Sequence, residues 1–184
     1  APIDPLKEYF IDGVVDIGLS QITVPIGGLH ITGYNRNVSG LISNEDNFTM
    51  FVSPSGGSGT LSIKNTAIIA TGANSQVYDL NFNSGTLELY DMTYANLTSM
   101  GQITDAMFLN EFNVVRFSGS PELTLNGAMQ GIDIRYSKGL NFNSSAFTLF
   151  KEGTALQIAD RFALNMEVDL GANTVLTDIA PSAF

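Results

Sequence analysis

The sequence contains no cysteine, no tryptophan and a single histidine, His30. Without cysteine the chain forms neither a disulfide framework nor a thiolate metal site. One imidazole cannot build a multi-histidine metal site, and it leaves one candidate for a histidine general base. Alternation along a strand points His30 away from the apolar face of its neighbours, Leu29 and Ile31. We therefore expect an outward-facing, structural histidine, no metal site and no other cofactor.

Charged side chains are also scarce, at 14% of the chain, and only 8 of them are Lys or Arg against 18 Asp and Glu. The resulting net charge of −10 argues against nucleic acid as a partner, because the phosphate backbone requires a positive surface. No apolar run approaches the ~18 residues of a membrane-spanning helix, and the first ten residues lack the basic-then-apolar layout of a signal peptide. We expect neither nucleic acid nor membrane as a partner.

What the chain does contain is a recurring strand pattern, Leu-x-Ile/Leu-x-Gly/Asn/Asp. It occurs at Leu29–Gly33, Leu61–Asn65, Leu87–Asp91, Leu123–Gly127 and Leu156–Asp160. Alternation places two aliphatic side chains of each unit on one face, and the last residue tolerates the left-handed conformation of a corner. The pentapeptide LNFNS, at 80–84 and 140–144, is a second repeated strand-and-corner element.

The leading leucines, at 29, 61, 87, 123 and 156, are about 30 residues apart. Further short apolar strands before and after each unit give about three strands per interval. This layout predicts a right-handed parallel β-helix of four to five turns, in which each turn stacks on the next. An antiparallel β-sandwich or jelly roll also has many short strands, and it is the alternative.

Two short segments have helical patterns. Residues 1–12 are predicted to be an N-terminal arm or capping helix, in which Asp4 caps, Pro5 takes the first helical position and Gly13 ends the helix. Residues 13–184 then form a single β-helix domain. Thr104 caps a second predicted helical turn that runs to Glu111.

Several carboxylates could pair across adjacent turns, where strands lie roughly 4.8 Å apart. They are Asp79, Glu88, Asp91, Glu111, Glu122, Asp133 and Glu152. Glycoside hydrolysis requires such a pair, and Glu88 with Asp91 is the best-placed local candidate. Solvated surface acids are the favoured interpretation, since most Asp and Glu are exposed. Asp133 and Arg135 point to the same side of one strand and are expected to neutralise each other.

The Leu-x-Ile-x-Asn/Gly coils over residues 20–170 resemble the pectate-lyase-type right-handed β-helix proteins. The catalytic segments of polygalacturonase-like members (NTD, DD, GHG and RIK) are all missing, and His30 lies in GLHITG instead. The abundance of Asn, Ser, Gly and Thr, the lack of Cys and Trp, and the acidic charge are similar to β-helix proteins of tailed-bacteriophage virions. That resemblance implies a structural protein without catalytic residues.

We therefore expect a non-enzymatic virion protein, a capsid decoration or cement protein that bridges capsid subunits at the capsid surface and is assembled in the host cytoplasm. Its partners would be the major capsid protein or other virion proteins and further copies of itself in a homotrimer. The candidate interaction residues are Leu6, Tyr9, Phe10, Tyr90 and Tyr94.

The alternative hypothesis is a tail spike or fibre that binds a surface glycan, with or without cleaving it. Under it, one groove is lined by Tyr78, Tyr90, Tyr94, Glu88 and Asp91. Glu88 and Asp91 would be the catalytic acids of this alternative.

Overall fold

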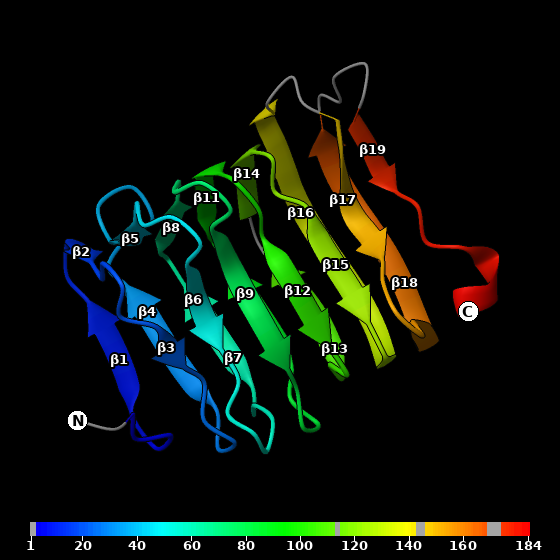
Figure 1. Cartoon of the computed structure of the whole chain (residues 1–184), viewed down its shortest axis with the longest axis horizontal. Helices are drawn as coiled ribbons and strands as arrows, with labels where there is room; N and C mark the ends of the chain where they lie inside the picture. Colours follow the sequence, from blue (N-terminus) through cyan, green and yellow to red (C-terminus); the bar gives the residue numbers. More distant parts are fainter. Residues whose placement is uncertain (1–2, 113–114, 143–145, 169–173) are drawn as a thin grey trace.

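The computed structural model describes residues 3–112, 115–142, 146–168 and 174–184 as a stack of parallel β coils (Figure 1). Every pairing between its named strands is parallel. Seven strands stack in one sheet, so the chain makes about six turns, against the four to five expected. The predicted parallel β-helix is confirmed, and the antiparallel alternative is wrong.

Each turn contributes one strand to each of three faces. Face A holds β1 (Glu8–Ile11), β4 (Leu29–Gly33), β7 (Leu61–Lys64), β10 (Leu87–Tyr90) and β13 (Phe108–Phe112). Face B holds β2 (Val14–Asp16), β5 (Gly40–Ser43), β8 (Ala67–Ala70), β11 (Thr93–Leu97) and β14 (Val115–Gly119). The long strands β16 (Ala128–Phe142) and β18 (Gln157–Val168) pair along both faces, which joins A and B into one 12-stranded sheet.

Face C is the separate seven-stranded sheet on the remaining side of the stack. It holds β3 (Ile22–Thr23), β6 (Thr49–Val52), β9 (Gln76–Asn81), β12 (Gly101–Thr104), β15 (Leu123–Asn126), β17 (Phe147–Glu152) and β19 (Thr174–Thr177). The first and last strands therefore lie at opposite ends of the stack (Figure 1).

Rows of inward aliphatic side chains run along face A and form its part of the core. One row is Leu29, Leu61, Leu87, Leu109 and Ile132. The next inward row is Ile31, Ile63, Leu89, Glu111 and Ile134. All of these side chains are at most 5% exposed, so burial of this apolar surface drives the stacking of the coils. Glu111 is the one acidic member of the second row.

Only three of the five repeat units lie at the same position in the coil. The units that begin at Leu29, Leu61 and Leu87 are in register on face A. The unit at Leu123 forms β15 on face C, and the unit at Leu156 leads into the start of β18. Alternation identifies a strand in each case, but it is the same on every face and does not specify which one.

The two LNFNS segments also occupy different places. The first crosses the end of β9 on face C, whereas the second begins in β16 and its last two residues, 143–144, lie outside the described residues. The corner prediction is confirmed at Asn65 (φ 53°), Asp91 (φ 54°) and Gly127 (φ 69°), which are left-handed, whereas Gly33 and Asp160 do not have a positive φ.

Both helical predictions are wrong. Residues 8–11 form β1, in which Tyr9 and Ile11 point inward in register with Ile31 and Gly33. The segment after Thr104 turns a corner and enters β13. In the part of the chain that the structure describes, the only helix is the 3₁₀ turn Pro181–Ala183 (η1), and no helix there is long and apolar enough to cross a membrane.

Candidate functional site

Of the candidate catalytic pair, Glu88 lies on the outer side of β10 and Asp91 is the corner residue that follows this strand, where it is held in an ion pair. Asp91 accepts a hydrogen bond from Arg36, which reaches it from the corner between β4 and β5. The Arg36 side chain is only 12% exposed and that of Asp91 28%. Glu88 is in register with Ser62 and Asn110, and both are uncharged. Asp91 therefore has a structural partner that ties two distant coils together.

We expect Asp91→Asn to lower the free energy of unfolding by about 1–3 kcal/mol, because a largely buried Arg36 loses its charged acceptor. Asparagine tolerates the left-handed backbone at this corner, so the loss of charge is isolated from backbone strain. Urea denaturation monitored by circular dichroism measures the difference. Glu88→Gln is the matched control and should change stability by less than about 0.5 kcal/mol. Equal losses in both variants would contradict the structural role of Asp91.

The aromatic groove expected beside these acids is not formed. Tyr78 and Tyr94 are 0% exposed, and their hydroxyls hydrogen-bond to each other in the core. Burial raises the pKa of both phenols well above the ordinary value. Only Tyr90, 44% exposed, lies on the surface. Tyr94 is therefore not available to a partner, and the site predicted for a glycan around Glu88 and Asp91 loses two of its three aromatic side chains.

Glu111 is the most unusual acid of the molecule, because it sits in the aliphatic row between Leu89 and Ile134. It is 0% exposed and accepts a hydrogen bond of 2.6 Å from Ser137, while its other carboxyl oxygen has no hydrogen-bond partner. Burial raises the pKa of Glu111 to about 7, and the bond from Ser137 only partly opposes this. A fully buried carboxyl cannot reach a substrate, so we assign it no catalytic role.

Asp133 forms the predicted pair with Arg135, and the structure adds a second cation, Arg161. Arg135 and Arg161 bond the same Asp133 oxygen at 2.6 and 2.7 Å. The hydrogen bond from Arg135 lowers the pKa of Asp133. Burial opposes this shift, and the hydrogen bond from Arg161 adds to it. Both guanidinium groups are more than half exposed, whereas Asp133 is 10% exposed. The cluster neutralises a buried acid on face A.

The N-terminal end of the stack is open. The strands β1, β2 and β3 pair on one side only, because each ends its row in the sheets. Between them lies a hollow of about 260 Å³ lined by apolar side chains, which include Tyr9, Ile11, Val15, Ile22, Leu29 and Leu41. Phe10 lies at its edge and is 62% exposed, and Leu6 is 94% exposed. Of the predicted interaction residues, Leu6, Tyr9 and Phe10 thus gather at this end.

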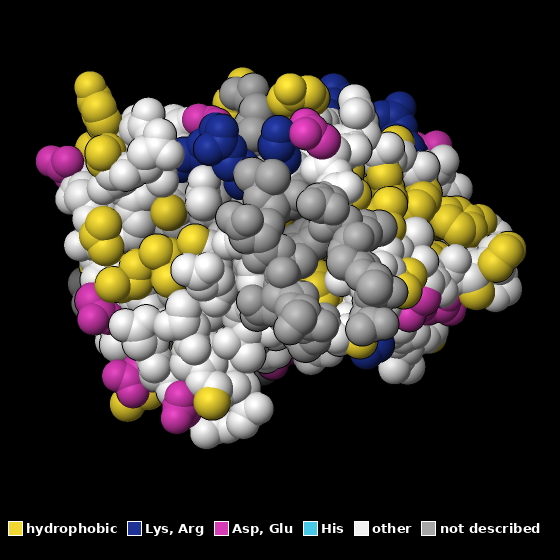
Figure 2. All heavy atoms as spheres, turned by 90° about the horizontal axis from the view of Figure 1, so that it is seen from above, with side chains coloured by type: hydrophobic (Ala, Val, Ile, Leu, Met, Phe, Trp, Pro, Cys, Tyr) yellow, Lys and Arg dark blue, Asp and Glu magenta, His cyan; other side chains and the backbone are white. Residues whose placement is uncertain are grey.

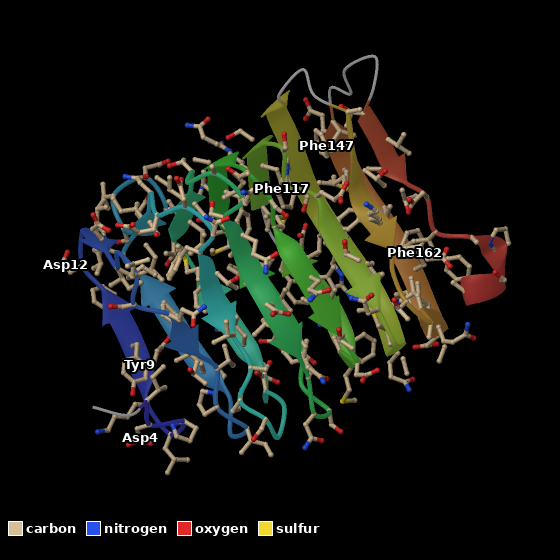
Figure 3. The ribbon with its side chains drawn as sticks, in the orientation of Figure 1. Asp4, Tyr9, Asp12, Phe117, Phe147 and Phe162 are labelled. Carbon is tan, nitrogen blue, oxygen red and sulfur yellow. The ribbon has the colours of Figure 1, made fainter. Side chains whose placement is uncertain are left out.

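The C-terminal end is partly covered by the last residues of the chain. Ala183 in η1 is 1% exposed, and the ring of Phe184 packs edge-on against Phe162 of β18 at 5.5 Å (Figure 3). Leu176 and Ile179 pack against the core from the same segment. Hydrophobic side chains are visible toward both ends from above (Figure 2), but eight of the 13 exposed large ones lie within residues 6–38.

A second hollow, of about 380 Å³, lies on the outer side of β1, β4 and β7. Its lining includes Lys7, Glu8, His30, Thr32, Ser62 and Lys64. His30 is exposed and points away from the core, as the sequence predicts. Nothing in the sequence pattern indicated this hollow, because its residues come from three coils.

Within the described ranges no three His, Asp or Glu side chains come together as a possible metal site. Comparison with protein-family models, curated proteins and solved structures finds no match to this chain. The resemblance to pectate-lyase-type and bacteriophage proteins therefore extends to the β-helix fold alone.

Proposed function

We propose that the chain is a non-enzymatic structural protein that docks on a larger assembly through the open N-terminal end. The observation that carries this proposal is the apolar hollow framed by three unpaired strand edges. Unpaired edges and exposed core side chains favour addition of further β-structure or an apolar surface. At the C-terminal end Leu176, Ile179 and Ala183 pack against the core, so that end is partly covered by the chain itself, although β18 and β19 also keep one unpaired edge.

The charges around this end favour a partner of a particular kind. Asp4, Glu8, Asp12 and Asp16 all belong to the first coil, and Lys7 is the only Lys or Arg among residues 3–20. Two copies placed end to end would bring these carboxylates together, which is unfavourable. A partner that presents Lys or Arg around an apolar patch is complementary. In the virion hypothesis that partner is the major capsid protein, and the chain is a capsid decoration or cement protein.

The experiment that tests this function is co-sedimentation of the chain with purified capsid shells from the same genome, together with its solution mass by light scattering. We expect the chain to sediment with the shells and to raise their resistance to heat. The homotrimer stays a prediction, and it requires three times the monomer mass of 19.7 kDa. A chain that never sediments with shells would overturn the capsid assignment.

A further inference from the structure

The hollow over β1, β4 and β7 has one wall built by the turn Pro5–Lys7, and this turn is held by several contacts. The amide of Leu6 donates to the side chain of Asp4 at 3.0 Å, and the amide of Asp4 donates to the hydroxyl of Tyr9 at 2.7 Å (Figure 3). Pro5 packs so closely on Gly27 that a Cβ there would lie 2.7 Å from the proline ring. The wall is therefore fixed by packing and hydrogen bonds.

The floor of the hollow is an array of polar side chains set by strand register. Glu8, His30 and Ser62 occupy successive strands in one outward row. Thr32 and Lys64 form the next outward row, and the Thr32 hydroxyl donates to Glu8. Because neighbouring strands lie about 4.8 Å apart, several of these donors and acceptors lie within reach of one small polar ligand.

The charge of the hollow differs from that of the whole chain. Two ammonium groups, Lys7 and Lys64, face one carboxylate, Glu8, whereas the chain carries −10. Lys7 makes an exposed 3.5 Å pair with Asp4, which contributes little, and Lys64 is in no ion pair of the described residues. An oxyanion between the two lysines would gain charge-assisted hydrogen bonds.

From this geometry we propose that the hollow binds an anionic saccharide. A carboxylate or phosphate group of the ligand lies between Lys7 and Lys64, and its hydroxyls bond Glu8 and His30, whereas Ser62, only 2% exposed, lies in the floor. The volume of about 380 Å³ is at the lower end of the ~300–1,000 Å³ range of small-molecule sites, which suits one or two sugar residues. Lys7 and Glu8 belong to the first coil, beside the open apolar end, but the hollow lies on the outer side of β1, β4 and β7, and binding there does not require docking to a capsid.

The single histidine makes the test specific to this site. The ring-proton signals of His30 are followed by NMR at constant pH and ionic strength during titration with glucuronate and with glucose 6-phosphate. Glucose, inorganic phosphate and sodium chloride serve as reference titrations. We expect saturable movement with at least one of the acidic sugars, and the one that binds more tightly identifies the carboxylate or the phosphate as the preferred group.

Lys64→Ala should weaken this binding about tenfold or more, since it removes one of the two ammonium groups. Lys151→Ala is the matched control, because Lys151 is paired with Glu122 on face C and should leave binding unchanged. The proposal is overturned if both acidic sugars shift the His30 ring-proton signals no more than sodium chloride does. It is also overturned if glucose binds as tightly as the acidic sugars, or if inorganic phosphate binds as tightly as the preferred sugar. Equal binding by the two lysine variants would also overturn it. Since the isolated chain is used, this outcome is independent of shell binding.

Discussion

Gly101→Ala is expected to lower the free energy of unfolding by about 3–5 kcal/mol, since it combines a steric clash with backbone strain. Gly101 begins β12 with φ +93°, and a Cβ there would lie 2.0 Å from the carbonyl oxygen of Tyr78 in the coil below. That oxygen is backbone and cannot rotate away. The clash therefore forces the two coils apart where Tyr78 is fully buried. Chemical denaturation of the purified variant measures the loss.

Gly13→Ala separates the clash from the strain. Gly13 has a similar φ of +86°, but no atom lies within 4 Å of a Cβ at this position. We expect this variant to cost only the left-handed backbone strain, about 1–2 kcal/mol. If the two alanine variants lost the same stability, the close stacking of coils at Gly101 would be wrong.

The stability of the chain is expected to decrease as the pH rises from about 4.5 to about 7, and Glu111→Gln should remove this dependence. The pKa of Glu111 is about 7 in the folded chain against an ordinary value of 4.5, so the folded state holds a proton that the unfolded state releases. An unfolded state that binds fewer protons makes the free energy of unfolding fall with pH. The full effect is about 3 kcal/mol at pH 8 relative to pH 4.

Other groups near Glu111 do not mimic this effect. Its polar neighbours are Ser137 and the hydroxyls of Tyr78 and Tyr94, whose pKa is raised by burial, so both stay neutral at pH 8. Asp133 affects the free energy of unfolding in another pH range. Because Arg135 lowers its pKa, the stabilisation from Asp133 is present at neutral pH and is lost only below about pH 4.

The measurement is the difference in free energy of unfolding between Glu111→Gln and the unsubstituted chain from pH 4 to pH 8. Glutamine keeps an acceptor for Ser137 and carries no charge, so this difference should move by about 3 kcal/mol in favour of the variant. A difference that stays constant across this range would show that Glu111 is not a buried, protonated acid.

The sequence was sufficient to predict a parallel β-helix because a strand unit such as Leu29–Gly33 recurs about every 30 residues, with further short apolar strands between the units. It could not assign each strand to a face, since the unit at Leu123 has the same alternation on face C as the units at Leu29, Leu61 and Leu87 have on face A. The prediction of an N-terminal helix was wrong because the apolar residues of a segment as short as 4–12 fit both the helical period of about 3.6 residues and the strand period of two. Pairing of β1 with β4 decides in favour of the strand.

The candidate sites were less predictable, because they depend on register between coils. Arg36 and Asp91 are 55 residues apart, and no local pattern joins them. Glu111 was expected at the surface, although alternation from Leu109 places it inward once β13 is recognised as a strand. Tyr94 was misplaced for the same reason: it lies on the inward side of β11. The hollow over β1, β4 and β7 needs three coils in register before its residues meet.

The central claim of the proposed function, docking through the open N-terminal end, is tested most directly by comparing Val15→Lys with Val175→Lys in co-sedimentation with capsid shells. The two valines are similarly exposed, 43% and 48%, and belong to strands at opposite ends of the stack. A lysine at position 15 places a charge at the apolar hollow, so we expect a loss of shell binding of about tenfold or more. Val175→Lys should bind like the unsubstituted chain. Equal binding by the two variants, or a greater loss in Val175→Lys, would contradict docking through the N-terminal end.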